Sequence, residues 1–176
     1  MKSILAMSGS NSINSINKIW ANYIANRIEN ARIVEFDWSK FDLPLYGPDL
    51  EKKIGIPEKV SAFNALIDQS DAIVLSLAEY NGLPTPAFKN LWDWTSRLDV
   101  KIWGNKPMFL SATSPGKLGG RNVLRVIKEA IPHFGGNLVV DFSLPLFHQN
   151  FKEGEMINSD LMEELDLKIQ LFQKQI

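Results

Sequence analysis

Short apolar segments that alternate with longer amphipathic ones constrain this chain more than any other feature of its sequence. The short segments are seven or eight residues long and rich in Val, Ile, Leu and Phe, as buried strands are. They cover residues 2–8, 31–37, 71–78, 106–113 and 137–144. Each is followed by apolar residues at helical spacing, over 15–30, 57–70, 85–98, 120–135 and 159–175. This alternation predicts βαβ units, and therefore a doubly wound α/β fold with a parallel sheet between two helical layers.

Composition narrows the range of functions. The 176 residues are 45% apolar and 22% charged, which is typical of a globular chain, and we expect a single domain over residues 1–176. A net charge of -1 gives no field that would recruit nucleic acid or an anionic membrane. The absence of cysteine excludes disulfides, thiolate nucleophiles and cysteine metal sites. The N-terminal apolar run is too short for a signal peptide or a membrane span, so we expect a cytoplasmic protein.

Three irregular loops follow the first, third and fourth predicted strands. They are residues 8–17, 78–86 and 113–121, and all are rich in Gly, Asn, Ser or Pro. In open parallel sheets, ligands bind outside the carboxyl ends of the strands, near the point where the strand order reverses. The three loops are therefore predicted to form one site at this edge of the sheet.

The first loop, SGSNSINSIN, carries no charge and leads directly into a predicted helix. A helix N-terminus stabilises an anion through free amides and the helix dipole, and the hydroxyls of Ser8, Ser10, Ser12 and Ser15 add possible donors. The alternative is a capped helix start, with Ser15 or Asn14 as the cap. The loop lacks GxxxxGK[ST] and GxGxxG, which argues against a nucleoside triphosphate loop and a dinucleotide loop.

The other two loops suit a flat ligand. AEYNGLPTP offers backbone groups around Asn81 and Gly82 and a tyrosine that can lie against a ring, although a left-handed turn alone explains Asn-Gly. TSPGKLGGR contains glycines that let backbone approach a ligand closely, unless it is only a flexible connector. Together the three loops predict a site for a mononucleotide, with the phosphate in the first loop and the ring between the others.

These segments resemble the NADPH-dependent FMN reductase family, which includes chromate, quinone and azo-dye reductases. GSNSINSIN is similar to the family's GS-x-R-x-x-S-x-N phosphate loop, and AEYNGLPTPAFKNLWDW to its PEYNGS-x-P-x-x-LKN-x-x-DW segment. SPGKLGGR is similar to its S-x-G-x-x-GG-x-R loop. The resemblance implies a flavodoxin-like three-layer α/β/α sandwich whose five parallel strands are ordered 2-1-3-4-5.

The resemblance also implies which residues hold FMN, and no catalytic side chain is expected because the flavin carries the chemistry. The phosphate would be bound at Ser10, Asn11, Ser15, Ile16 and Asn17. The isoalloxazine ring would lie between Glu79, Tyr80, Asn81 and Gly82 on one side and Ser114, Gly116 and Gly119 on the other.

Two positions depart from the family pattern. Ser12 stands where the family has an arginine, and Ala78 where it has a proline. FMN binding can depend on amides and the helix dipole alone, but the 2′-phosphate of NADPH needs a cation, so a preference for NADPH over NADH is less well supported. Arg121 and Lys117 are the remaining candidates for that cation.

The implied function is an oxidoreductase that transfers hydride from NAD(P)H to FMN and passes electrons to quinone-, azo- or metal-type small molecules. The alternatives are a flavodoxin-like electron carrier without a nicotinamide site, which is usually strongly acidic, and a non-enzymatic flavodoxin-like module. The resemblance suggests a homodimer or homotetramer that uses the helix bearing Trp94, with no nucleic-acid or membrane partner. Residues 43–57, with their prolines and glycines, are predicted to lack regular structure. The long loop over residues 39–56 is expected either to reach a neighbouring subunit's flavin or to cover the chain's own sheet edge.

Overall fold

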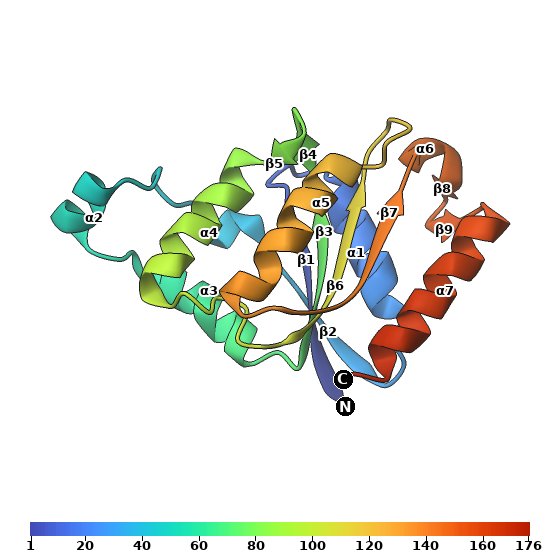
Figure 1. Cartoon of the computed structure of the whole chain (residues 1–176), viewed down its shortest axis with the longest axis horizontal. Helices are drawn as coiled ribbons and strands as arrows, with labels where there is room; N and C mark the ends of the chain where they lie inside the picture. The colour runs from blue at the N-terminus through green and yellow to red at the C-terminus, as the bar shows by residue number, and fades with distance from the viewer.

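A computed structural model describes residues 1–176, with a parallel sheet of five strands at its centre (Figure 1). The strands are β1 (Lys2–Ser8), β2 (Ala31–Glu35), β3 (Ala72–Leu77), β6 (Pro107–Thr113) and β7 (Asn137–Leu144). Their order is β2-β1-β3-β6-β7, so the predicted order of the five main strands is confirmed. The direction of strand addition reverses between β1 and β3, which is where ligands bind in sheets of this kind.

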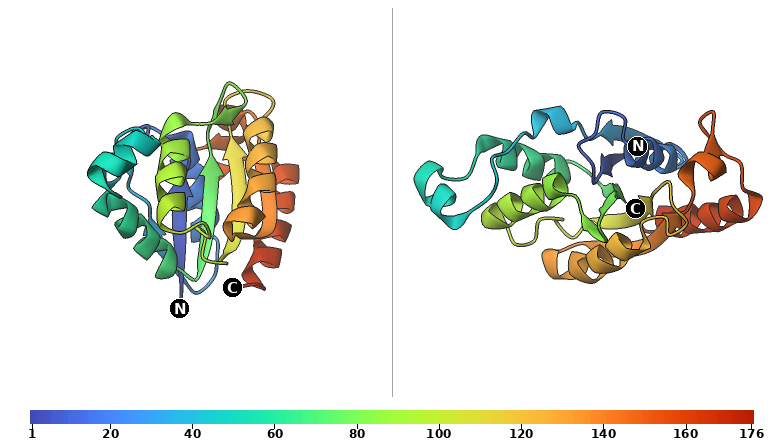
Figure 2. Two further views of the ribbon diagram at one scale, coloured as in Figure 1. Left: turned by 60° about the vertical axis from the view of Figure 1, so that its left-hand side comes forward. Right: turned by 90° about the horizontal axis from the view of Figure 1, so that it is seen from above.

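Helices cover both faces of the sheet, and Figure 2 shows the three layers from two further directions. The long helices are α1 (Ile16–Asn26), α3 (Glu58–Asp68), α4 (Pro86–Leu98), α5 (Arg121–Ala130) and α7 (Ser159–Gln173). Buried side chains of α1 and α7 join one core cluster, and those of α3, α4 and α5 join the other. The doubly wound α/β prediction is therefore correct.

The central strands explain why the sequence is apolar at every position there. Along β1, the side chains of Leu5 and Met7 pack with α3, α4 and α5, whereas those of Ile4 and Ala6 pack with α1 and α7. All four residues are buried. A parallel strand covered on both faces needs an uninterrupted apolar run, because successive side chains point to opposite faces.

Residues 43–57 contain regular structure, so the prediction that they lack it is wrong. A short 3-10 helix, η1 (Trp38–Lys40), follows β2, and α2 (Pro48–Ile54) lies further along. Pro48 begins α2 and Gly55, at φ +72°, ends it. No residue of α2 is buried, and a helix without a buried face leaves no amphipathic pattern in the sequence.

The segment that carries α2 is fixed to α4 of the same chain. The side chain of Asn90 donates to the Pro44 carbonyl at 3.0 Å, and the Trp94 indole donates to the same carbonyl at 2.7 Å. Arg97 Nε lies 3.0 Å from Glu51 Oε2 in α2. Trp94 is fully buried by this contact, so its ring cannot be the subunit contact that the sequence suggested for its helix.

Smaller elements also differ from the prediction. Two-residue strands form the hairpins β4–β5 (Glu79–Tyr80 with Leu83–Pro84) and β8–β9 (Phe151–Lys152 with Glu155–Met156), too short to produce a periodic pattern. A four-residue helix, α6 (Phe147–Asn150), precedes the second hairpin. The predicted helix over 120–135 splits into α5 and the 3-10 helix η2 (Ile131–Phe134), because Pro132 cannot continue α-helical bonding. None of the helices has both the length and the apolar character that crossing a membrane requires.

Candidate functional site

The loops after β1, β3 and β6 meet at the carboxyl edge of the sheet, because these three parallel strands are neighbours. They surround a cleft of about 270 Å³. Predicted residues that line it are Ser10, Ser15, Ile16, Asn17, Glu79, Tyr80 and Ser114, together with Ser12, Asn14, Ala78, Thr113 and Pro115. The predicted residues Asn11, Asn81, Gly82, Gly116 and Gly119 do not line it.

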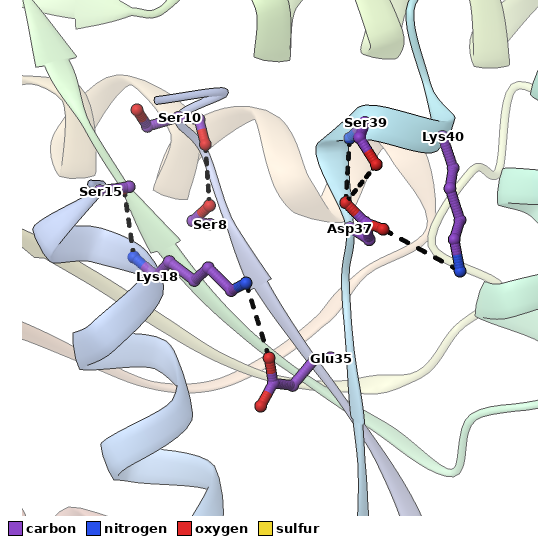
Figure 3. Close-up of polar contacts among 8 residues, drawn as sticks. All are labelled: Ser8, Ser10, Ser15, Lys18, Glu35, Asp37, Ser39 and Lys40. Atoms are coloured by element: carbon purple, nitrogen blue, oxygen red, sulfur yellow. Dashed lines mark hydrogen bonds and ion pairs between the residues drawn. The ribbon is translucent and has the colours of Figure 1, made fainter. Parts of the chain in front are cut away.

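The first loop is a compact turn held by its own hydroxyl groups (Figure 3). Ser8 Oγ donates to the Ser10 carbonyl at 2.9 Å, and the Ser12 amide donates to Ser10 Oγ at 3.2 Å. Ser15 caps α1, since its Oγ accepts from the Lys18 amide at 3.2 Å. The capped-helix alternative therefore describes the geometry correctly. It does not exclude an anion, because a hydroxyl that accepts one hydrogen bond still has a proton to donate.

The first turn of α1 leaves backbone donors free beside these hydroxyls. The amides of Ile16 and Asn17 donate to no other group in the chain, and both residues line the cleft. Ser10 and Ser15 are buried, at 4% and 6% exposure, although their side chains are polar. Free amides at a helix start together with hydroxyl donors form the arrangement that binds phosphate without a lysine or arginine.

Asn17 has a second role that its sequence position did not reveal. Its Oδ1 accepts from Ser76 Oγ at 2.7 Å and from the Thr113 amide at 3.1 Å, while its Nδ2 donates to the Thr113 carbonyl at 3.2 Å. These bonds connect the start of α1 to the ends of β3 and β6. The side chain of Asn17 therefore holds the loops of the cleft in place, and its backbone amide has no partner in the chain.

Two residues outside the predicted set support the first loop from behind. Thr85 Oγ1 donates to the Gly9 carbonyl at 2.6 Å and accepts from the Phe88 amide, so one hydroxyl both holds the loop and caps α4. Trp38 Nε1 donates to the Ser8 carbonyl at 2.9 Å. A threonine immediately before a proline-initiated helix was the available signal for the cap, but nothing in the sequence pointed to its bond with Gly9.

The second loop is a β-hairpin. Asn81 and Gly82 both adopt positive φ, at 54° and 82°, which two-residue hairpin turns of type I′ require. The left-handed turn considered from the sequence is therefore correct. The hairpin places Tyr80 at the mouth of the cleft with half of its surface exposed.

Glu79 is the only charged side chain that lines the cleft, and its carboxylate is directed at the start of α5. Its Oε2 accepts from the amides of Asn122 and Val123 at 3.0 and 2.9 Å, and its Oε1 from Asn122 Nδ2 at 3.2 Å. Gly120, at the N-cap position, has no side chain to do this. Glu79 thus caps α5 from the hairpin, and its negative charge is balanced by the helix N-terminus.

Gly119 and Gly116 of the third loop differ in how much space a side chain would have. A Cβ at Gly119, at φ +58°, would lie 2.6 Å from Ser143 Oγ and 2.7 Å from the Pro145 nitrogen. Glycine at position 119 is therefore required by its close approach to the end of β7. Gly116 has open space around it, with no atom nearer to a Cβ than Ser114 Oγ at 3.8 Å.

Cations stay out of the cleft. Lys18, in the first turn of α1, points to Glu35 of β2, with Nζ 3.7 Å from Oε2 (Figure 3). The loop beyond β2 holds Asp37, whose carboxyl pKa is lowered by hydrogen bonds from the hydroxyl and amide of Ser39. An anion in the cleft would therefore be held by amides, hydroxyls and the α1 dipole, as the uncharged sequence of the loop predicts.

A doubly wound parallel sheet of five strands in this order, with an uncharged loop at its switch point, is the flavodoxin-like fold. The sequence model of the NADPH-dependent FMN reductase family matches residues 2–151. A quinone reductase of Escherichia coli K12 is 28% identical over 141 residues, covering 74% of this chain and 72% of that protein. A 2-hydroxy-1,4-benzoquinone reductase of a Burkholderia species is 36% identical over 78 residues, 44% of this chain and 42% of that protein.

A solved structure shares nearly the whole fold. The flavoenzyme NAD(P)H:(acceptor) oxidoreductase FerB of Paracoccus denitrificans superposes with a TM-score of 0.78 at 24% identity, covering 99% of both chains. The chain belongs to the NADPH-dependent FMN reductase family. It is accordingly a flavoprotein oxidoreductase, with FMN as cofactor and NAD(P)H as electron donor.

Proposed function

We propose that this chain binds the FMN phosphate in its first loop, oxidises NAD(P)H, and passes the electrons to small quinones. The observation that carries the proposal is the pair of unpaired backbone amides at Ile16 and Asn17, two residues that line the cleft together with Ser10 and Ser15. These donors fit a doubly negative phosphate, and no carboxylate of the first loop opposes it. The whole chain, residues 1–176, would act as one flavin-binding domain.

The other two loops would hold the ring. Tyr80 of the second loop and Ser114 of the third line the cleft, and the turn at Asn81 and Gly82 and the backbone at Gly116 belong to the same two loops. When bound, FMN supplies the redox chemistry, since its ring accepts hydride and releases electrons. The residues of the chain therefore need only fix the ring and leave one face open to the nicotinamide and then to the acceptor. Such a site predicts ping-pong kinetics.

A quinone is the acceptor that the rim of the cleft favours. Each of the three loops carries an exposed apolar or aromatic side chain: Ile13 at 96%, Tyr80 at 50% and Leu118 at 57% exposure. A flat apolar acceptor gains contact area from such a rim, whereas a hydrated metal ion does not. The relatives named for quinone reduction support the same acceptor class.

The proposal also includes a homo-oligomeric assembly and a cytoplasmic location. A groove of about 370 Å³ between α4 and α5, lined by Leu83, Trp92, Val126 and Phe134 among others, would be the face that joins a second copy in a homodimer or homotetramer. A cytoplasmic location agrees with the NAD(P)H requirement. Analytical ultracentrifugation of the purified protein measures the oligomeric state.

An absorbance spectrum tests the function. The purified chain should be yellow, or become so after incubation with FMN, and the flavin bands should bleach on addition of NADH or NADPH. Adding 1,4-benzoquinone or ferricyanide should restore the bands and sustain NAD(P)H oxidation. A protein that stays colourless with FMN would refute the proposal. A protein that binds FMN but is never reduced by NAD(P)H would instead be an electron carrier.

A further inference from the structure

Leu146 has a backbone conformation that leucine rarely adopts. It lies between β7 and α6 at φ +50° and ψ +52°, in the left-handed region. Glycine and asparagine enter this region at little cost, whereas a larger side chain is strained there. Three of the four other non-glycine residues at positive φ are asparagines. Backbone strain of this kind persists only where the surrounding contacts enforce it, and it concentrates at functional sites.

Hydrogen bonds on both sides hold Leu146 in this conformation. Its amide donates to the Gly116 carbonyl at 3.0 Å, and its own carbonyl accepts from the amides of Gln149 and Asn150 at 2.8 and 3.1 Å. Asn150 Nδ2 donates to the preceding carbonyl, that of Pro145, at 2.8 Å. The side chain of Leu146 belongs to neither core cluster, so packing in the core does not explain the strain. The left-handed backbone instead directs the Leu146 amide to the third loop.

The third loop is attached to this turn through its carbonyls. Three donors of residues 143–147 bond to three carbonyls of the loop, each at 3.0 Å: Ser143 Oγ to Gly119, the Leu146 amide to Gly116, and the Phe147 amide to Ser114. Figure 1 shows α6 beside the loop that follows β6. Ser114 lines the cleft, so the turn at Leu146 fixes one wall of the cleft.

The amides of the third loop are left free. Those of Ser114, Gly116 and Lys117 donate to no other group in the chain. In a trans peptide, the N–H points opposite to the carbonyl of the preceding residue. Because the Gly116 carbonyl points to Leu146, the Lys117 amide points away from Leu146. The turn therefore decides the direction in which the loop presents its donors.

We propose that Leu146 is a positioning residue for the flavin, and that its left-handed backbone orients the third loop so that the free amides donate to the ring of FMN. The inference rests on the proposed function, because it takes the ring to lie against the third loop. The reduced ring carries more negative charge than the oxidised ring, so a correctly placed amide stabilises reduced FMN more strongly. Leu146 thereby raises the reduction potential of the bound flavin, and it does so through its backbone conformation.

Two substitutions at position 146 separate the backbone conformation from the side chain. Isoleucine has the same atoms as leucine, but its branched Cβ disfavours positive φ, whereas asparagine is polar and adopts positive φ readily. We expect Leu146→Ile to weaken the binding of reduced FMN about tenfold relative to oxidised FMN, which lowers the two-electron midpoint potential by about 30 mV. Leu146→Asn should keep the potential of the unaltered chain. Equilibration of the FMN-loaded full chain with a reference dye measures the potential.

A second pair of variants tests the turn without changing Leu146. Asn150→Asp keeps the shape of the side chain but removes the donor to the Pro145 carbonyl, and it should also lower the midpoint potential. Gln149→Glu adds the same charge on an exposed neighbouring residue and should leave the potential unchanged. Circular dichroism checks that each variant is folded. If Leu146→Ile does not fold, the comparison of Asn150→Asp with Gln149→Glu decides in its place.

An unaltered potential in folded Leu146→Ile would overturn the inference. Equal falls in Leu146→Ile and Leu146→Asn would do the same, because the side chain and not the backbone would then matter, and so would equal falls in Asn150→Asp and Gln149→Glu. In each of these cases FMN still binds and NAD(P)H still reduces it, so only this inference fails. If the unaltered chain binds no FMN, or its FMN is not reduced by NAD(P)H, the proposed function fails.

Discussion

Ser15 combines a structural bond with a proposed binding role, and the two can be separated. Its Oγ caps α1 by accepting from the Lys18 amide, while its hydroxyl proton is free to point into the cleft. Aspartate caps helices as well as serine does, because it also accepts from the amides of the first turn. It has no proton to donate at neutral pH, and its charge repels a phosphate.

Ser15→Asp should therefore leave the fold intact and weaken FMN binding by at least about tenfold, since a charged repulsion replaces a charge-assisted hydrogen bond. Fluorescence titration with FMN measures the dissociation constant, and circular dichroism checks the helix content. Ser61→Asp, on the exposed side of α3, adds the same charge at a distance and should bind FMN normally. Unchanged affinity in Ser15→Asp would mean that the first loop is a helix cap and nothing more.

The β4–β5 hairpin and α5 act as one unit because Glu79 joins them. The carboxylate accepts from two backbone amides at the start of α5, so any movement of the hairpin breaks bonds at the helix end. Glu79 and Tyr80 of the hairpin line the cleft, and the bonds of Glu79 therefore fix this wall of the cleft to the start of α5.

Glu79→Gln removes the charge and one of the acceptors of these bonds. We expect the free energy of unfolding to fall by about 1 to 2 kcal/mol, which is the range for losing a charged helix cap. Urea unfolding followed by tryptophan fluorescence measures this loss. FMN affinity, measured where both proteins are folded, should also fall several-fold, whereas Glu163→Gln on the exposed surface of α7 should alter neither quantity. A purely structural role for Glu79 would lower stability and leave the affinity unchanged.

At the scale of the whole molecule, the site lies where α1, β1, β3 and β6 come together. Asn17 bonds both to Ser76 and to Thr113, so the phosphate loop is connected to the two strands that carry the other loops. A ligand that binds all three loops stabilises the folded chain as a whole, because the unfolded chain has no such site.

FMN at one hundred times its dissociation constant should add about 2.7 kcal/mol to the free energy of unfolding. For a chain of this length that corresponds to a rise of about 5 to 10 °C in Tm. Riboflavin, which has the ring without the phosphate, is the matched control, and at the same concentration it should raise Tm much less. Equal shifts from the two flavins, measured by calorimetry, would contradict a phosphate cradle at the first loop.

The layered α/β architecture could be predicted from the sequence because it depends on local periodicity, whereas the order of the strands came only from the family resemblance. The meeting of the three loops could also be predicted, because neighbouring parallel strands bring the loops after them to one edge. Two kinds of element were missed because they leave no periodic pattern. Helix α2 has no buried face, and the two-residue strands β4 and β5 are too short to show alternation.

The hydrogen-bond partners of the polar side chains at the site could not be predicted from the sequence. Asn17 meets its partners 59 and 96 residues away, Glu79 caps a helix 43 residues further on, and Thr85 holds a carbonyl 76 residues earlier. Gly119 packs against the end of β7. Such pairings depend on how the sheet and helices pack, and a side chain with several possible partners carries no sign in the sequence of which one it will meet.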